Sequence, residues 1–512
     1  MQPPYYGPGA PNYGGQEQYA QQQAQPGGYQ QDPRHQGGYA DNKMALAPND
    51  YQGERFKPAR PKIRDPFFAL LFIIVFLGYT GLSVYVLREY AISGVSGGLG
   101  GNTGASGTLN SHTALLLTFS CALALVLSGL YLLLVRVATR FILEITLLLS
   151  VISSVAYAAY LWYEGFTSAA IMATIFAVLA VVSYFFMRSR IPLTRLLLKT
   201  TIDATRVYPS VYLWALTGLV AQTLFSIWVS WTLIAVYQRF SPSGAAAGSS
   251  SSSGAVTGLV VFIGFAFYWI SETIKAIFFS TVCAIFGTHY YSLDNQKQRG
   301  AGIKAFGRAT SFSLGSLAFG SLIVAILDII RGLVSIIQQT EASQGDMVGA
   351  AIACVAGCII SCIAWLIEFF NKYALINVSL YGNSYITAAK ETWRLMKDRG
   401  IDALATDSLV NIVWTYGSIV VGILVGIFAY VYEKQTDPEA LNQTSSYYSI
   451  ILLAAVALAT QICLTLGQGS IGSGTATLFV ALAEDPQTMA QKEPQLFELI
   501  RRSYPRVVQG VA

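Results

Sequence analysis

Charged side chains are scarce in this chain of 512 residues, where they make up 12% of the sequence. That is about half of their share in a typical soluble domain. Hydrophobic residues account for 54%, and the mean hydropathy is +0.49. Several apolar stretches reach the roughly 20 residues that a helix needs to cross a bilayer. These features exclude a soluble globular protein and predict an all-α polytopic membrane protein.

Histidine and cysteine are also scarce. The chain has three histidines, far apart in the sequence, which excludes a histidine-rich metal centre inside the membrane. All six cysteines fall in apolar stretches, so no disulfide framework is implied in the loops. Cys354, Cys358 and Cys362 recur every four residues and share one helix face. A soft-metal site is one interpretation of that spacing, and small buried residues at a helix contact are the favoured one.

Motifs of nucleotide-dependent enzymes are missing. No Walker A sequence is present, so ATP is not expected to drive this protein. The GxGxxG of 467–472 follows an apolar stretch rather than a strand, which favours close helix packing or a local break over dinucleotide binding. Gly422 and Gly426 form a GxxxG, typical of a helix contact. We therefore expect no enzymatic activity and no cofactor.

The N-terminal residues 1–64 lack the apolar content needed to fold, as the segment PNYGGQEQYAQQQAQPGGYQQ illustrates. They contain no apolar core of a signal peptide, and Gln2 excludes N-myristoylation. We predict a disordered cytosolic tail rich in Gln, Pro, Tyr and Gly. Its Pro3-Pro4-Tyr5-Tyr6 matches the PPxY ligand of WW domains, which makes a WW-domain ubiquitin ligase a candidate partner. A chance match in a tail of this composition is the alternative.

Ten membrane spans are predicted in a transmembrane domain of residues 65–485, followed by a cytosolic segment 486–512. The spans are 66–88, 113–135, 141–162, 168–187, 209–237, 256–286, 311–337, 349–380, 409–432 and 447–468. The segments on one side of these spans carry 24 Lys and Arg residues, and those on the other side carry three. By the positive-inside rule both termini are cytosolic. The net charge of +5 therefore reflects topology and does not imply a nucleic-acid partner.

Two loops carry further signals. Asn442 begins an Asn-Gln-Thr sequon in the predicted outer loop after span 9, so it is a candidate glycosylation site. Residues 192–206 form a predicted inner helix that opens with proline and has Arg195 and Lys199 opposite its leucines. An interfacial helix on the anionic inner leaflet and a solvated connector both fit this pattern.

Charged residues inside the predicted spans are the main candidates for function, because a charge in lipid is unfavourable. Three acidic residues occur there, each with a base three or four residues further along its own helix. The pairs are Glu272–Lys275, Asp328–Arg331 and Glu368–Lys372. Neutral pairs that hold the helices together are one interpretation, and the favoured one for Asp328–Arg331, which lies nearer the interface.

Aromatic neighbours distinguish Glu272 and Glu368. Tyr268 and Trp269 precede Glu272 by four and three residues, and Trp365 precedes Glu368 by three. A carboxylate beside aromatic faces attracts an organic cation through charge and cation–π contact. A cation or proton site and a purely structural pairing therefore remain as alternatives.

Three long stretches resemble the choline transporter-like family. They are YWISETIKAIFFSTVCAIFGTHYY, IEFFNKYALINVSLYGNSYITAAKETWRLM and SGTATLFVALAEDP, while SRIPL is similar to the fungal branch in particular. The resemblance covers about residues 64–505. It implies ten spans, cytosolic ends, a plasma-membrane location and transport of a choline-like solute. The first outer segment, 89–112, departs from the large cysteine-containing loop of choline-carrying animal members, since it is short, glycine-rich and cysteine-free.

The leading hypothesis is a plasma-membrane transporter of a small, cation-type solute that is not driven by ATP. A non-transporting membrane protein, such as a lipid-handling or scaffold component, is the alternative. The candidate solute-binding residues are Tyr268, Trp269, Glu272, Lys275, Trp365, Glu368, Asn371 and Lys372. Asn371 enters this set because it lies within the long stretch that resembles the family.

Overall fold

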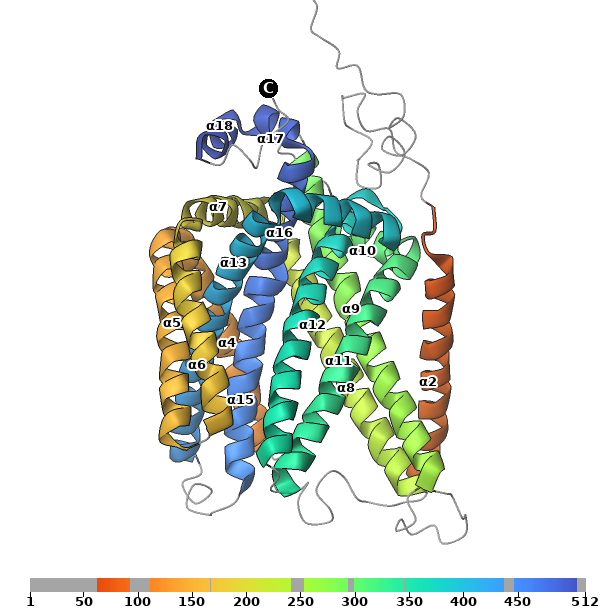
Figure 1. Cartoon of the computed structure of the whole chain (residues 1–512). Coiled ribbons are helices and arrows are strands. Elements are labelled where there is room, and N and C mark those ends of the chain that lie inside the picture. The colour runs from red at the N-terminus through yellow and green to blue at the C-terminus, as the bar shows by residue number, and fades with distance from the viewer. Residues whose placement is uncertain are drawn as a thin grey trace, which may run out of the picture. The chain divides into compact units, whose positions relative to one another are not determined.

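Figure 1 shows a computed structural model that describes residues 62–92, 111–165, 167–240, 253–292, 299–344, 347–436 and 446–503. Within these residues the regular elements are all helical, and ten helices are long and apolar enough to cross a membrane. The predicted all-α polytopic architecture is confirmed. The PPxY motif and Asn442 lie outside the described residues.

The ten membrane helices follow one another along the chain. They are α2 (Pro66–Ile92), α4 (Ser111–Val137), α5 (Thr139–Tyr163), α6 (Thr167–Arg188), α8 (Ser210–Phe240), α9 (Ser253–Tyr291), α11 (Leu314–Gln344), α12 (Met347–Tyr381), α13 (Tyr385–Thr436) and α15 (Ser446–Leu464), which continues through the π-helix η2 (Thr465–Gly472) into α16 (Ser473–Glu484). Each covers most or all of one predicted span. Several extend further, because a helix does not have to end where its apolar window ends.

The outer faces of these helices are apolar and open. In α2 only 11% of the apolar window is buried within the protein. Leu70, Leu77 and Val84 recur every seven residues on this helix and are each about 60% exposed. A soluble monomer does not leave apolar faces of this extent in water. Lipid acyl chains are the environment in which such faces are stable.

Four short helices lie at one end of the described bundle, the upper end in Figure 1. They are α7 (Ile191–Val207), α10 (Ala301–Ser311), α17 (Pro486–Lys492) and α18 (Pro494–Ser503). The helix predicted for residues 192–206 is thus confirmed as α7, with proline in its first turn. Leu193 and Leu197 are buried against the bundle, whereas Arg195 and Lys199 are exposed on the opposite side.

Glycines bring α13 and the last membrane helix into close contact, as the sequence predicts. A Cβ atom on Gly422 would lie 2.4 Å from Thr460 Oγ1. One on Gly467 would lie 2.0 Å from the Trp414 ring. The GxGxxG motif lies in η2, where the helix widens to π geometry. The motif is therefore a site of tight packing and a local break in the α-helix, both of which were expected.

Candidate solute-binding site

A cavity of about 660 Å³ opens between α8, α9, α11, α12 and the α15–η2–α16 helix. Its walls carry three acidic and three basic side chains. These are Glu272, Lys275, Asp328, Arg331, Glu368 and Lys372. Glu368 is the middle residue of the apolar span Val355–Tyr381, so the cavity reaches the central part of the membrane segment. Transporters commonly hold their substrates at this depth.

Asp328, Arg331 and Glu368 form a charged triad across α11 and α12. Arg331 Nη1 donates to Asp328 Oδ1 at 3.2 Å on its own helix. It also donates to Glu368 Oε1 on α12. The three side chains are 31%, 23% and 35% exposed in the order Arg331, Asp328 and Glu368, so all remain accessible from the cavity. Two carboxylates facing one guanidinium give the triad a formal net negative charge.

The other charged residues form two neutral pairs. Lys275 Nζ lies 2.6 Å from Glu272 Oε1, as the spacing predicts. Lys372 Nζ pairs with Asp407 Oδ1 of α13. The predicted pairing of Lys372 with Glu368 on the same helix is therefore wrong, because each finds its partner on a neighbouring helix. With both pairs neutral, the excess negative charge of the site lies on the triad.

The predicted aromatic surroundings of the glutamates differ from the observed ones. Trp269 is fully buried, and its Nε1 donates to Ala318 O at 2.9 Å, which makes it a link between α9 and α11. Tyr268 directs its hydroxyl toward Gly332 of α11. Trp365 is 48% exposed and lines a separate groove. The structure therefore separates these three side chains from the cavity that contains Glu272 and Glu368.

Two phenylalanines take their place in the cavity wall. Phe278 and Phe279 follow Glu272 by six and seven residues on α9, and both line the cavity. Phe278 lies close to α8, since a Cβ on Gly218 would come within 2.8 Å of its ring. Aromatic faces are thus present beside the charges, and α9 provides them from the turns after Glu272.

Asn371 lies in the cavity wall and is held in place by α13. The Tyr385 hydroxyl donates to Asn371 Oδ1 at 2.7 Å. Gly320 of α11 allows the close approach, since its Cβ would lie 2.8 Å from that oxygen and 2.9 Å from the Tyr385 ring. The Asn371 side chain is 5% exposed overall. Its carbonyl oxygen is therefore already bound by Tyr385.

The last membrane helix forms the remaining wall, which sequence reasoning missed. Gln461, Thr465, Gln468 and Ser473 line the cavity from α15, η2 and α16. Ser473 Oγ donates to Gly469 O at 2.8 Å within this segment. The seven-residue spacing of the two glutamines places them on one helix face, and this signal could have identified them.

Asp407 was also missed, although it binds a candidate residue. It lies just before the predicted start of span 9 at residue 409. An acidic residue at that position is expected at the membrane–water interface. In the structure α13 runs without a break from Tyr385, and Asp407 is 15% exposed within it. Its role depends on the contact between α12 and α13, which no local spacing reveals.

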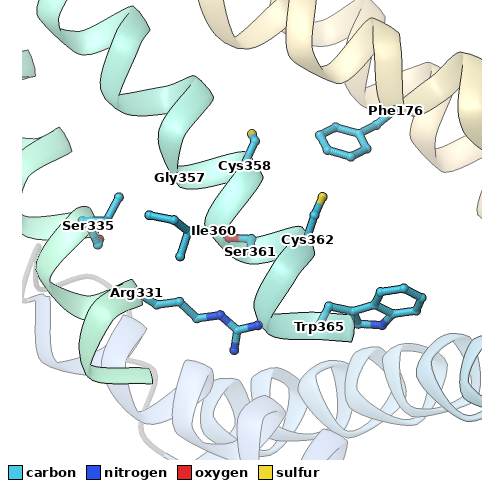
Figure 2. A pocket seen from close by; sticks show the side chains of 10 residues that line it. Phe176, Arg331, Ser335, Gly357, Cys358, Ile360, Ser361, Cys362 and Trp365 are labelled. Atoms are coloured by element: carbon cyan, nitrogen blue, oxygen red, sulfur yellow. The ribbon is translucent and has the colours of Figure 1, made fainter. Parts of the chain in front are cut away.

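A second, mainly apolar groove of about 530 Å³ lies between α6, α11 and α12. Figure 2 shows Phe176 of α6 opposite Cys358 and Cys362 of α12, with Arg331 extending from α11 at one end. Cys362 is exposed in this groove, so the expectation that the cysteines are buried at a helix contact is wrong for it. Among the described residues, no group of three His, Cys, Asp or Glu side chains is placed to hold a metal ion.

Comparison with known proteins identifies the chain's relatives. The family model described as "Plasma-membrane choline transporter" matches residues 171–487. Protein PNS1 of Mycosarcoma maydis is 54% identical over 515 residues, covering 100% of this chain and 96% of that protein. Protein PNS1 of Cryptococcus neoformans is 41% identical, covering 97% and 94%, and that of Candida albicans is 33% identical, covering 91% of each. The chain therefore belongs to the choline transporter-like family, in its fungal PNS1 branch.

Proposed function

We propose that this protein is a plasma-membrane transporter of a small organic cation of the choline type, which binds in the cavity between α8, α9, α11, α12 and the last membrane helix. The observation that carries the proposal is the net negative triad of Asp328, Arg331 and Glu368 beside the cavity. The matching family, described as a plasma-membrane choline transporter, supports the same class of solute.

The triad suits a cation because one of its carboxylates can change partner. Glu368 binds Arg331 from another helix, whereas Asp328 and Arg331 are neighbours on α11. When a solute ammonium approaches Glu368, Arg331 keeps Asp328 as its partner. The cation then neutralises the remaining carboxylate, and no charge is left alone in the membrane. Phe278 and Phe279 add aromatic surface nearby.

Glu272 and Lys275 form a second charged element of this cavity. Lys275 is 55% exposed and Glu272 17%, so the lysine is the more accessible of the two. We include the pair in the proposed site because both side chains line the same cavity as the triad. Transport then needs no ATP and proceeds by alternating access or facilitated diffusion. Both termini are proposed to be cytosolic, and Pro3-Pro4-Tyr5-Tyr6 is proposed to recruit a WW-domain ligase.

A ligand-stability screen of the purified full-length protein tests the function. Choline and other quaternary amines should raise its melting temperature, and Glu368→Gln should weaken the binding of the active amine about ten- to a hundredfold. Glu144→Gln is the matched control, because Glu144 forms an i,i+4 pair with Arg140 on α5 away from the cavity. Equal ligand responses of the two variants and the wild type would contradict the proposed site.

The Glu272–Lys275 pair has its own test. If Glu272 contributes to cation binding, Glu272→Gln lowers ligand affinity while the apo protein keeps its melting temperature. If the pair is only structural, Glu272→Gln lowers the melting temperature, and Glu272→Gln/Lys275→Met restores it. Full recovery of both stability and ligand binding in the double variant would remove this pair from the site.

A further inference from the structure

The cavity and the apolar groove are adjacent, and Arg331 contributes to the walls of both. The groove is lined by side chains of α6, α11 and α12 such as Phe176, Ile360 and Trp365. The cavity contains Asp328 and Glu368, the two partners of Arg331. An anionic site and an apolar site are therefore separated by the Arg331 side chain. Figure 2 shows this side chain extending from α11 along the end of the groove.

The charge at this junction favours a cation over an anion. Arg331 alone would attract an anionic lipid headgroup, but its guanidinium is already bound by two carboxylates. The local sum is negative, so a phosphate or carboxylate ligand would be repelled. The groove itself offers few polar groups and lies among membrane-spanning helices, where an alkyl chain is the matching occupant.

We propose that this protein binds amphiphilic cations, namely quaternary ammonium compounds with an alkyl chain, with the ammonium at Glu368 and the chain in the groove of Phe176, Ile360, Cys362 and Trp365. This inference rests on the proposed function and extends its substrate class. The headgroup takes the place of Arg331 on Glu368. Arg331 stays paired with Asp328, so its displacement from Glu368 leaves no unpaired guanidinium and opens the wall between the two sites.

The proposal predicts how the affinity for an amine depends on the length of its alkyl chain. Each methylene that enters the groove contributes up to about 0.8 kcal/mol, which is about fourfold in affinity. Affinity should therefore rise along the series from tetramethylammonium through butyl-, hexyl- and octyltrimethylammonium. The measurement uses the full-length protein in lipid nanodiscs, with each amine below its micelle-forming concentration. The readout is the ratio of the dissociation constants of tetramethylammonium and octyltrimethylammonium.

Substitutions on adjacent residues of α12 distinguish binding of the alkyl chain in the groove from general partitioning of the amine into lipid. Cys362 lines the groove, so Cys362→Trp should fill it and reduce the ratio at least tenfold. Ile363 is 52% exposed and does not line the groove, so Ile363→Trp is the matched control and should keep the wild-type ratio. Ser361→Trp is a second filling variant if the first fails to fold. Octylsulfonate, with the same chain and an anionic head, should not bind.

The outcomes distinguish this inference from the proposed function. If tetramethylammonium binds and affinity does not change with chain length, the groove inference is wrong and the cation site stands. A chain-length effect that persists in Cys362→Trp and Ser361→Trp, or that octylsulfonate shares, also overturns the groove. If no quaternary amine of any length binds the wild type, both the inference and the proposed function fail.

Discussion

At the scale of single residues, we expect the loss of the contact between Lys372 and Asp407 to lower the stability of the protein most. The two side chains are 23% and 15% exposed and join α12 to α13. Lys372→Met leaves Asp407 unpaired at this depth, and the loss of one partner of such a pair destabilises by about 3 kcal/mol. We expect Lys372→Met to lower the melting temperature in detergent, and Lys372→Met/Asp407→Leu to restore most of it.

A solute contact of Lys372 would give a different result. In that case the double variant recovers its melting temperature but still fails to bind the quaternary amine that stabilises the wild type. The melting temperatures of the two variants therefore report the contribution of Lys372 to helix packing. Their amine affinities report its contribution to the cavity that it lines.

Lys492 should add a pH dependence to stability. It lies at the end of α17, and its Nζ donates to His289 O of α9, with Glu493 as its acidic neighbour. Burial lowers the pKa of Lys492 to about 8, whereas the ordinary value is 10.5. The unfolded chain then binds more protons between these values, so stability rises as the pH increases from about 8 toward 10.5. Lys492→Met should flatten this rise in melting temperature. If the melting temperatures of Lys492→Met and the wild type differ by the same amount at every pH, the prediction is wrong.

Local spacing predicted some of the charged contacts and not others. Glu272–Lys275 and Asp328–Arg331 are three residues apart on one helix, and the structure forms both. Glu368 pairs with Arg331 and not with Lys372 on its own helix, because α11 and α12 pack side by side. Candidate residues could thus be found from the sequence, but the choice of partner between helices depends on packing that no single-helix pattern contains.

At the scale of elements, the π-helix η2 depends on two glycines in unequal ways. A Cβ on Gly467 would lie 2.0 Å from the Trp414 ring, whereas one on Gly469 would meet only Thr465 Cγ2 at 3.7 Å. Gly467→Ala should therefore separate η2 from α13 and lower the melting temperature by several degrees. Gly469→Ala, two residues away in the same helix, should leave it nearly unchanged. Equal effects would mean that helix propensity, rather than contact with Trp414, governs this segment.

The start of α2 is linked to the cavity through α13. Asp65 Oδ2 accepts hydrogen bonds from Ser316 Oγ at 2.6 Å and from the Tyr385 main-chain N–H at 2.7 Å. The Tyr385 hydroxyl in turn holds Asn371 in the cavity wall. Asp65 adopts a left-handed φ of 49°, a strained conformation for a non-glycine residue, which these bonds help to maintain. The segment that connects the tail to α2 is therefore coupled to a candidate solute-binding residue.

Two substitutions test the bonds of Asp65 and the bond between Tyr385 and Asn371 separately. Asp65→Ala removes both bonds of the carboxylate and should destabilise the protein by roughly 2 kcal/mol. Tyr385→Phe keeps the main-chain bond to Asp65 and releases only Asn371, so it should change amine affinity with a smaller loss of stability. A Tyr385→Phe variant with wild-type amine affinity would show that Asn371 does not need its tyrosine partner to serve the cavity.

The existence of the membrane helices was predictable, and their ends were not. Apolar runs of sufficient length predicted ten spans, and the described residues contain ten helices that are long and apolar enough to cross a membrane. The last helix continues past the predicted end at residue 468 through η2 to Glu484, because its glycines and small polar residues still pack against protein. A hydropathy window detects lipid contact, and it cannot detect a helix that is buried within the bundle.

At the scale of the whole molecule, the charge asymmetry predicts which end of the bundle faces the cytosol. The basic helix α7 lies at the same end as α10, α17 and α18 (Figure 1). The ten spans place the start of α2 and the end of α16 on one side, and the sequence places 24 basic residues in the segments of that side. An anionic inner leaflet attracts these residues, so we expect this end to be cytosolic.

Cysteine labelling tests this orientation directly. In the sequence Asn442 falls between α13 and α15, and the alternation of the ten spans predicts that it is on the opposite side from Ser292, the residue after α9. In intact cells, Asn442→Cys should react with a membrane-impermeant thiol reagent, and Ser292→Cys should react only after permeabilisation. The parent chain, whose cysteines all lie in apolar segments, provides the background signal. If the labelling pattern is reversed, the bundle is inverted, and Asn442 cannot be glycosylated because it faces the cytosol.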